Sequence, residues 1–258
     1  MTHAHNDAVR EQFRIQAATF TDEGFAARGL EWILEQLAPS ADAQVLDVAA
    51  GAAHLGRALA PHVNHVCALD LTREMLEQGQ RLATAAGLRN VTFTLADAAR
   101  LPYLDDQFDL VVCRLALHQV ADPAAMVREM VRVTRPGGRI GVTDMIADED
   151  SELAEETNRL ERLRDPSHNR TLSLTEVHAL LKAAGASVAS TAVRDHDLDL
   201  TDWLTRSETP APVRAQIRTH LEEELAGGTA TGLRPARGDD QAISFTHAWA
   251  TVTGTPRD

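Results

Sequence analysis

Short apolar segments alternate with amphipathic ones through the first half of the chain. Apolar runs with strand character cover residues 43–48, 64–70, 91–95, 108–115 and 139–146. Segments with the 3.6-residue periodicity of helices lie between them, at 54–62, 72–86 and 123–134. Strand–helix–strand repetition at this spacing predicts a parallel sheet with right-handed crossover connections.

The second half is less regular. A capping box, Ser173 with Glu176, predicts a helix that runs to about residue 184. Further elements are predicted as strands at 187–194 and 242–252, helices at 199–206 and 211–226, and an exposed loop at 227–240. The predicted fold is therefore α/β: a doubly wound, mostly parallel, seven-stranded Rossmann-like sheet. A helical N-terminal arm (1–38) precedes one domain (39–258), within which residues 147–185 form a lid.

Composition and charge narrow the set of partners. The chain has 258 residues, of which 44% are hydrophobic and 24% charged, as in an ordinary globular protein. A formal net charge of −13 repels nucleic-acid phosphates and anionic lipid head groups, so neither is an expected partner. No stretch of about 18 apolar residues and no signal sequence is present, which predicts a cytoplasmic protein.

Acidic residues follow three neighbouring strands. Asp47 lies in the first strand, before a turn of small residues (AAGAAH), and Asp70 ends the second strand 70 − 47 = 23 residues later. Asp97 follows the third strand. Ligands bind beyond the carboxyl ends of parallel strands, so these acids are expected to ring one pocket. No G-x-G-x-x-G is present, so the pocket suits a nucleoside with a cationic group better than a dinucleotide.

Several blocks, in the right order, resemble the class I S-adenosylmethionine-dependent methyltransferases, and more closely the branch around the ubiquinone and menaquinone C-methyltransferases. The blocks are VLDVAAGAAHLG, CALDLTREML, ADAARLPYLDDQFDLVVCRLALHQVADP and RVTRPGGRI. The similarity covers most of residues 8–252, and RLRDPSHNRTLSLTEVHALL also looks like a bacterial subgroup. The resemblance implies a methyltransferase with S-adenosylmethionine as cofactor.

The resemblance also implies cofactor contacts. Asp47 and Gly51 would flank the methionine part of the cofactor. Asp70 would hold the ribose diol, with Leu71 against the adenine face. The family usually has three glycines in the first motif, and alanine replaces the outer two here. Of these, Ala53 adds a methyl group where the backbone should approach the ligand.

The remaining cofactor contacts lie further along the chain and in the arm. Asp97 would accept a hydrogen bond from the adenine amino group, and Ala98 would supply a backbone contact. Arg114 and Leu115 would line the cofactor wall after the fourth strand. Phe20 resembles an aromatic residue that closes over the cofactor in relatives.

Candidate catalytic residues lie near the expected acceptor. His118 follows the fourth strand and can accept a proton near neutral pH, although it could equally bond a backbone group. His168, with Asp165 to orient it, is the second candidate, although this segment could equally be a helix-terminating turn. Arg170 could hold an acidic acceptor, and Asp144 ends the fifth strand at the pocket edge.

Other residues favour plainer interpretations. Trp203 and Trp249 are expected in the core rather than on a substrate platform. No set of His, Cys, Asp and Glu has the spacing of metal ligands, so no metal is expected. The two cysteines, Cys67 and Cys113, are expected as small buried residues.

The sequence therefore predicts methyl transfer to a small organic acceptor, such as a phenol, a quinone-like molecule or a secondary metabolite. Two alternatives stay open. One is an enzyme that binds the cofactor without methylating, such as a cyclase or isomerase. The other is a non-catalytic cofactor-binding or regulatory protein. The sequence also leaves open a homodimer and the choice between O-, N- and C-methylation.

Overall fold

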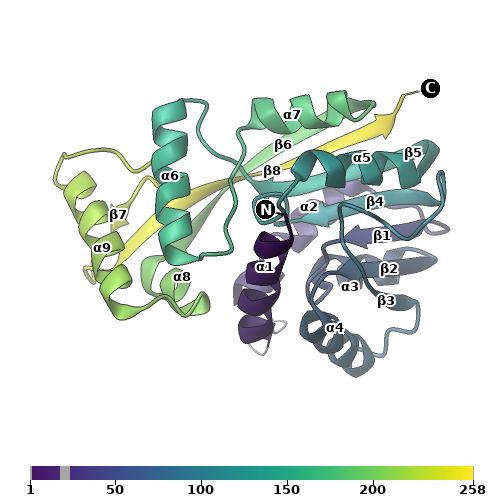
Figure 1. The fold of residues 1–258 in the computed structure, drawn as a ribbon, viewed down its shortest axis with the longest axis horizontal. Helices are drawn as coiled ribbons and strands as arrows, with labels where there is room; N and C mark the ends of the chain where they lie inside the picture. Colours follow the sequence, from purple (N-terminus) through teal and green to yellow (C-terminus); the bar gives the residue numbers. More distant parts are fainter. Residues whose placement is uncertain (1, 18–23, 258) are drawn as a thin grey trace.

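A computed structural model describes residues 2–17 and 24–257 and shows one sheet with helices on both faces (Figure 1). The strand order is β3-β2-β1-β4-β5-β8-β6, with β7 paired to β8. The strands are β1 (Gln44–Val48), β2 (His65–Asp70), β3 (Val91–Leu95), β4 (Phe108–Arg114), β5 (Thr134–Met145), β6 (Ala186–Asp199), β7 (Ala236–Arg237) and β8 (Ile243–Pro256). The doubly wound, mostly parallel fold is confirmed.

The helices follow the strands along the chain. The α-helices are α1 (Thr2–Gln16), α2 (Leu30–Leu37), α3 (His54–Leu59), α4 (Arg73–Ala85), α5 (Pro123–Val133), α6 (Ser151–Arg164), α7 (Leu174–Ala183), α8 (Leu200–Arg206) and α9 (Ala211–Leu225). Short 3₁₀ turns are η2 (Gly24–Ala27) and η3 (Ala60–His62). The N-terminal segment is helical as predicted, within its described residues.

Strands β1 to β5 run parallel, and their side chains alternate between two apolar layers. On β1, Val45 packs with the layer formed by α2 and α3, whereas Leu46 packs with the layer formed by α5 and α7. Both faces are therefore covered, which explains why the central strands read as nearly continuous apolar runs. This covering leaves the carboxyl ends of the strands as the place for a ligand.

Strands β6 and β8 are 14 residues long and extend beyond the rest of the sheet (Figure 1). They pair antiparallel, and their far ends pack with α6, α8 and α9 around a separate apolar cluster that includes Leu160, Trp203, Ile217 and Phe245. We call α6, α8, α9 and these strand ends the helical subdomain. It stands beside the sheet and faces the carboxyl ends of β1 and β4.

Several of the element boundaries predicted from the sequence were wrong. The strands predicted at 187–194 and 242–252 are longer than expected. The loop predicted at 227–240 contains the two-residue strand β7, so the described part of the chain has eight strands, one more than the seven predicted. Strand β5 begins at Thr134, although its pairing with β4 is irregular until Arg139 because the intervening Arg-Pro-Gly-Gly bulges.

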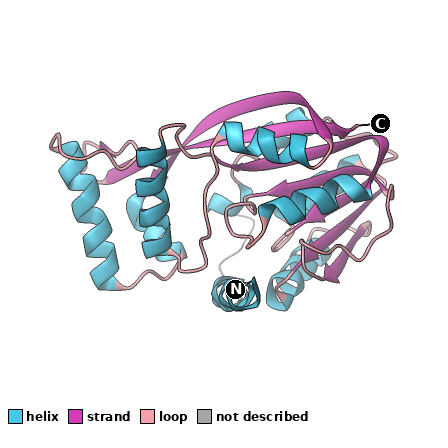
Figure 2. Cartoon of the chain, turned by 45° about the horizontal axis from the view of Figure 1, so that its top comes forward, coloured by secondary structure: helices cyan, strands magenta, loops and turns pink. Residues whose placement is uncertain are grey.

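The segment expected as a lid, residues 147–185, divides between two parts of the structure. Helix α6 belongs to the helical subdomain and contacts α9. Helix α7 packs against α5 and β6 and so covers the sheet. Helix α1 lies between the sheet and the helical subdomain, where both views place it (Figure 2). The elements that enclose the carboxyl ends of the strands are therefore α1 and the helical subdomain.

Candidate active site

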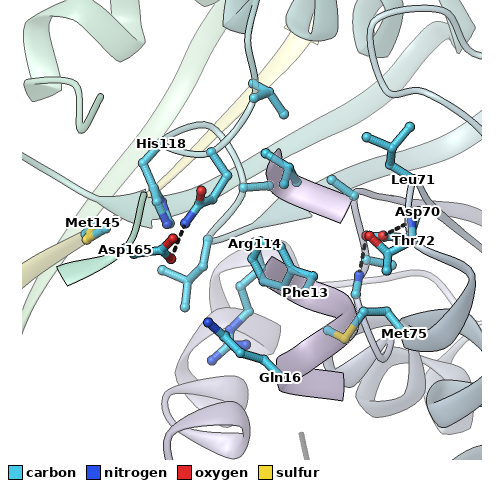
Figure 3. A pocket seen from close by; sticks show the side chains of 18 of the residues that line it. Phe13, Gln16, Asp70, Leu71, Thr72, Met75, Arg114, His118, Met145 and Asp165 are labelled. Atoms are coloured by element: carbon cyan, nitrogen blue, oxygen red, sulfur yellow. Dashed lines mark hydrogen bonds between the residues drawn. The ribbon is translucent and has the colours of Figure 1, made fainter. Parts of the chain in front are cut away.

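A cavity of about 480 Å³ lies where the carboxyl ends of the strands meet α1 and the helical subdomain. Most of the predicted site residues line it: Asp47, Gly51, Asp70, Leu71, Asp97, Ala98, Arg114, Leu115 and His118. Figure 3 shows Asp70 and Leu71 at one end, His118 and Asp165 at the other, and Arg114 and Phe13 between them. We call these ends the cofactor end and the acceptor end. Phe20 lies outside the described residues.

The turn after β1 contains three residues with a left-handed backbone. Ala49, Gly51 and Ala53 have φ values of 53°, 56° and 54°, all in the left-handed region that favours glycine. The two alanines adopt this conformation at a cost of roughly 1–2 kcal/mol each. Ala53 is fully buried at the start of α3 and is not among the residues that line the cavity within the described chain. The extra methyl group therefore does not narrow the cofactor end.

Asp70 is held by two backbone groups. Its Oδ2 accepts a hydrogen bond from Gly51 N and its Oδ1 from Thr72 N, both at 2.8 Å. Burial raises the pKa of the Asp70 carboxyl, and these hydrogen bonds act in the opposite direction. Each carboxylate oxygen keeps accepting capacity beyond its backbone partner. Asp70 can therefore receive the hydroxyls of a ribose without losing its own support.

Asp47 lies deeper, only 1% exposed, and its Oδ2 accepts a hydrogen bond from Gly56 N at 2.8 Å. A Cβ at Gly56 would lie 2.9 Å from this oxygen, so glycine allows α3 to approach β1. Burial raises the pKa of Asp47 to about 7, although the Gly56 bond and nearby Arg114 lower it. A cationic ligand would stabilise this carboxylate in its charged form, which fits the sulfonium of S-adenosylmethionine.

Arg114 and Asp97 complete the cofactor end. Arg114 donates a hydrogen bond to the Arg28 carbonyl at 2.8 Å, and its guanidinium lies 5.5 Å from the Trp249 ring centre. Asp97 accepts hydrogen bonds from Ala99 N at 2.9 Å and from Asn6 Nδ2 of α1 at 2.8 Å. Helix α1 therefore touches the acid that the resemblance assigns to adenine.

His118 is paired with Asp144. The His118 Nδ1 lies 2.6 Å from Asp144 Oδ1, and Asp144 Oδ2 accepts a hydrogen bond from Leu117 N at 2.7 Å. Because a carboxylate only accepts, Nδ1 carries the hydrogen and Nε2 keeps a lone pair. Burial lowers the pKa of His118, but the charge and hydrogen bond of Asp144, together with the charges of Glu161 and Asp165, outweigh it, so the pKa is raised. This arrangement is that of an oriented general base.

His168 lies behind His118. Its ring stacks on the His118 ring with centres 5.6 Å apart, and its Nε2 bonds Asn158 Oδ1 at 2.9 Å. Asp165 was expected to orient His168, but it does not. The Asp165 carboxylate instead accepts hydrogen bonds from Ser167. Burial lowers the pKa of His168 to about 3, so the ring is neutral. Among the described residues His168 is not part of the cavity lining, and it supports His118 from behind.

The helical subdomain supplies residues that sequence reasoning missed. Glu161, Arg164, Arg206 and His247 all line the acceptor end of the cavity. They come from α6, α8 and β8, which the long strands bring together, and no local motif marks them. By contrast, Arg170 pairs with Glu176 on the surface and does not line the described cavity.

Two tryptophans are buried in the core and also line the cavity. Trp203 and Trp249 are at most 1% exposed, as expected of core residues, yet both line the acceptor end. Phe25 meets the Trp249 ring edge-on with centres 5.5 Å apart. The acceptor end thus combines an aromatic wall with charged groups.

Two other kinds of feature, a metal site and a membrane-spanning helix, are absent from the described residues. Over residues 2–17 and 24–257, no group of three or more His, Cys, Asp and Glu side chains is arranged to hold a metal ion. None of the helices in those same ranges is both long and apolar enough to cross a membrane.

The doubly wound sheet and the ring of acids at its carboxyl edge define a class I methyltransferase architecture. The sequence model for the Methyltransferase domain matches residues 39–185, more than half of the chain. The chain belongs to this methyltransferase family.

Relatives agree with this assignment. The uncharacterized methyltransferase YcgJ of Bacillus subtilis is 35% identical over 235 residues, which cover 90% of this chain and 93% of YcgJ. Its crystal structure aligns with a TM-score of 0.81 at 33% identity, over 90% of this chain and 99% of that one.

Two further proteins match. A putative methyltransferase (BH2331) of Bacillus halodurans has a TM-score of 0.81 at 26% identity, covering 88% of this chain and 99% of that one. The demethylmenaquinone methyltransferase of Clavibacter sepedonicus is 42% identical over 108 residues, 42% of this chain and 43% of that protein. The chain is an S-adenosylmethionine-dependent methyltransferase, as the sequence predicted.

Proposed function

We propose that this enzyme methylates a small organic acceptor of the phenol or hydroquinone type, with His118 as the general base. The observation that supports the proposal most directly is the His118–Asp144 pair, in which His118 lines the same cavity as Asp47 and Asp70. A phenolic hydroxyl has a proton to lose, and the Nε2 lone pair of His118 is suited to receive it. The raised pKa of His118 makes it a stronger base.

The bound cofactor would supply a methyl group on a sulfonium, which is transferred by an in-line displacement. The chain's own contribution is to hold and orient the partners. Asp70 and Asp97 would hold the nucleoside through its hydroxyls and amino group. Trp203 and Trp249 form part of the cavity wall, against which an aromatic acceptor would pack. Orientation of two reactants of this kind contributes roughly 7–11 kcal/mol to lowering the barrier.

Transfer of a labelled methyl group tests the proposal. The enzyme would be incubated with S-adenosylmethionine carrying a labelled methyl group and a panel of phenols and hydroquinones. We expect labelled product, and a loss of about 10²–10⁴-fold in kcat for His118→Asn with unchanged affinity for S-adenosylhomocysteine. His178→Asn is the matched control, because His178 is only partly buried, does not line the described cavity, and forms its side-chain hydrogen bond with Thr191.

Two results would overturn the proposal. One is transfer by His118→Asn at the wild-type rate. The other is turnover of a phenol to an unlabelled product, which would show an enzyme that uses the same pocket without methylating.

A further inference from the structure

The acceptor end of the cavity contains a guanidinium group without a matching anion. Arg206, at the end of α8, lies with its guanidinium carbon 3.7 Å from the centre of the Phe25 ring. Within residues 2–17 and 24–257 its guanidinium makes no hydrogen bond and no ion pair. Arginine carries five N–H donors in a planar fork, so contact with an aromatic face leaves its donors unsatisfied. This group is available to a ligand in the cavity.

Neighbouring acids do not neutralise Arg206. The buried carboxylate of Glu161 acts on Arg206 through space, but its ion pair is with Arg164, at 2.7 Å. Asp199 accepts a hydrogen bond from Asp202 N and so caps α8. Asp202 lies one turn before Arg206 and acts on it through space, but the two form no ion pair in the described structure.

A second guanidinium reinforces the positive charge. Arg28 lines the same cavity, and its side chain donates to the carbonyl of Asp197 rather than to a carboxylate. Burial lowers the pKa of Arg206 to about 10, and the charges of Arg164 and Arg28 act in the same direction. Arg206 is thus protonated at neutral pH in partly desolvated surroundings, where an anion would be bound more strongly than in water.

Arg206 lines the same cavity as His118, the proposed base. His247 lines the cavity and lies within electrostatic range of both His118 and Arg206. Because Arg206 and His118 line one cavity, an acceptor anchored at Arg206 would extend towards His118. The aromatic rings of Trp203 and Phe25 border the same space.

We infer that the acceptor carries an oxyanion, a carboxylate or a phosphate, which Arg206 binds through its guanidinium fork. This inference rests on the proposed function, because it takes the acceptor end as the place where the acceptor binds. Guanidinium matches the geometry of two oxygens in one plane, which gives such a pair both strength and orientation. The acceptor is thus a small hydroxylated aromatic acid or aryl phosphate, oriented with its anion at α8 and its hydroxyl at His118.

Calorimetric titration of matched probes tests the inference. Benzoate, phenyl phosphate and uncharged benzamide would each be titrated into the enzyme saturated with S-adenosylhomocysteine. We expect at least one anion to bind tenfold or more tightly than benzamide, and the two anions together show whether carboxylate or phosphate is preferred. Arg206→Gln should weaken binding of that anion at least tenfold and leave benzamide unchanged.

Two further variants control for indirect effects. Arg206→Lys keeps the charge over Phe25 but loses the planar fork, so anion affinity should fall between the wild type and Arg206→Gln. Arg218→Gln removes a guanidinium from α9 that does not line the described cavity, and should change nothing. Affinity for S-adenosylhomocysteine should stay within twofold in all three variants.

The inference is overturned if benzamide binds as tightly as both anions, if no probe binds, or if Arg206→Gln keeps the wild-type affinity for the anion. Failure of the proposed function would look different. In that case no labelled methyl group is transferred to a phenol, while anion binding that depends on Arg206 is still measured when the titration is repeated without S-adenosylhomocysteine.

Discussion

Replacement of Asp144 by asparagine should lower the pKa of His118. Asp144 is 3% exposed, and its Oδ1 accepts from both the His118 ring and Met145 N, at 2.6 and 2.8 Å. Its Oδ2 accepts from Leu117 N. Asparagine has nearly the same shape but carries no charge and only one accepting oxygen. The substitution therefore removes the main contribution that raises the pKa of His118, leaves the smaller ones of Glu161 and Asp165, and keeps the burial that lowers it.

The size of the effect follows from the energy of the lost contact. A hydrogen bond to a charged group contributes about 1.5–3 kcal/mol, and one pKa unit corresponds to 1.36 kcal/mol. Asp144→Asn should therefore lower the His118 pKa by roughly 1–2 units. Either the His118 ring and the Met145 amide, or the Leu117 amide, lose their acceptor, which costs about 1–3 kcal/mol of stability for each donor.

The stability difference should also depend on pH. Because the folded pKa of His118 is raised above its unfolded value, the His118–Asp144 pair stabilises the fold fully below the unfolded pKa. This contribution is lost as the pH rises through the folded pKa. The difference in unfolding free energy between wild type and Asp144→Asn should thus be larger near about pH 6 than near about pH 9.

NMR titration measures the pKa without an acceptor. The ring signals of isotope-labelled histidine would be followed against pH in both proteins, with His118→Asn used to assign the signal of His118. A pKa for His118 in Asp144→Asn that equals or exceeds the wild-type value would refute the proposed role of Asp144.

Further predictions concern the turn and the second histidine. Gly51→Ala should weaken S-adenosylhomocysteine binding about tenfold, because the new methyl group lies 3.0 Å from Met75 on the cavity wall at a φ of 56°. Ala53→Gly should leave this affinity within twofold, and calorimetry compares the two. His168→Phe should lower the unfolding free energy by about 1–3 kcal/mol, because Asn158 loses a donor, which thermal unfolding measures. It should lower kcat far less than His118→Asn; an equal loss would show that His168 acts in the chemistry.

The cofactor end could be predicted from the sequence because it is encoded locally. Each acid lies near or just beyond the carboxyl end of a strand, and parallel strands bring these ends to one edge, so Asp47, Asp70 and Asp97 meet once the strands are found. His118 was found for the same reason. Ala53 was expected to disturb cofactor binding because the family's glycine at this position was taken as a point where the ligand approaches the backbone. The structure shows instead that Ala53 has a left-handed backbone and a buried methyl group.

The acceptor end could not be predicted because its residues are far apart in the sequence. Glu161, Arg206 and His247 meet only because β6 and β8 extend beyond the sheet and carry the helical subdomain. The lengths of these strands were underestimated, since the extra residues lie at a polar edge and lack a continuous apolar run. Arg170 was considered as a contact for an acidic acceptor, and the fold instead directs it to Glu176.

A crystal structure with S-adenosylhomocysteine and the phenol that is methylated fastest would test the account most directly. We expect the acceptor oxygen to lie about 2.6–3.2 Å from His118 Nε2, within the cavity that also contains the nucleoside on Asp70 and Asp97. An acceptor bound outside this cavity, or with its hydroxyl turned away from His118, would contradict the assignment of His118 as the base.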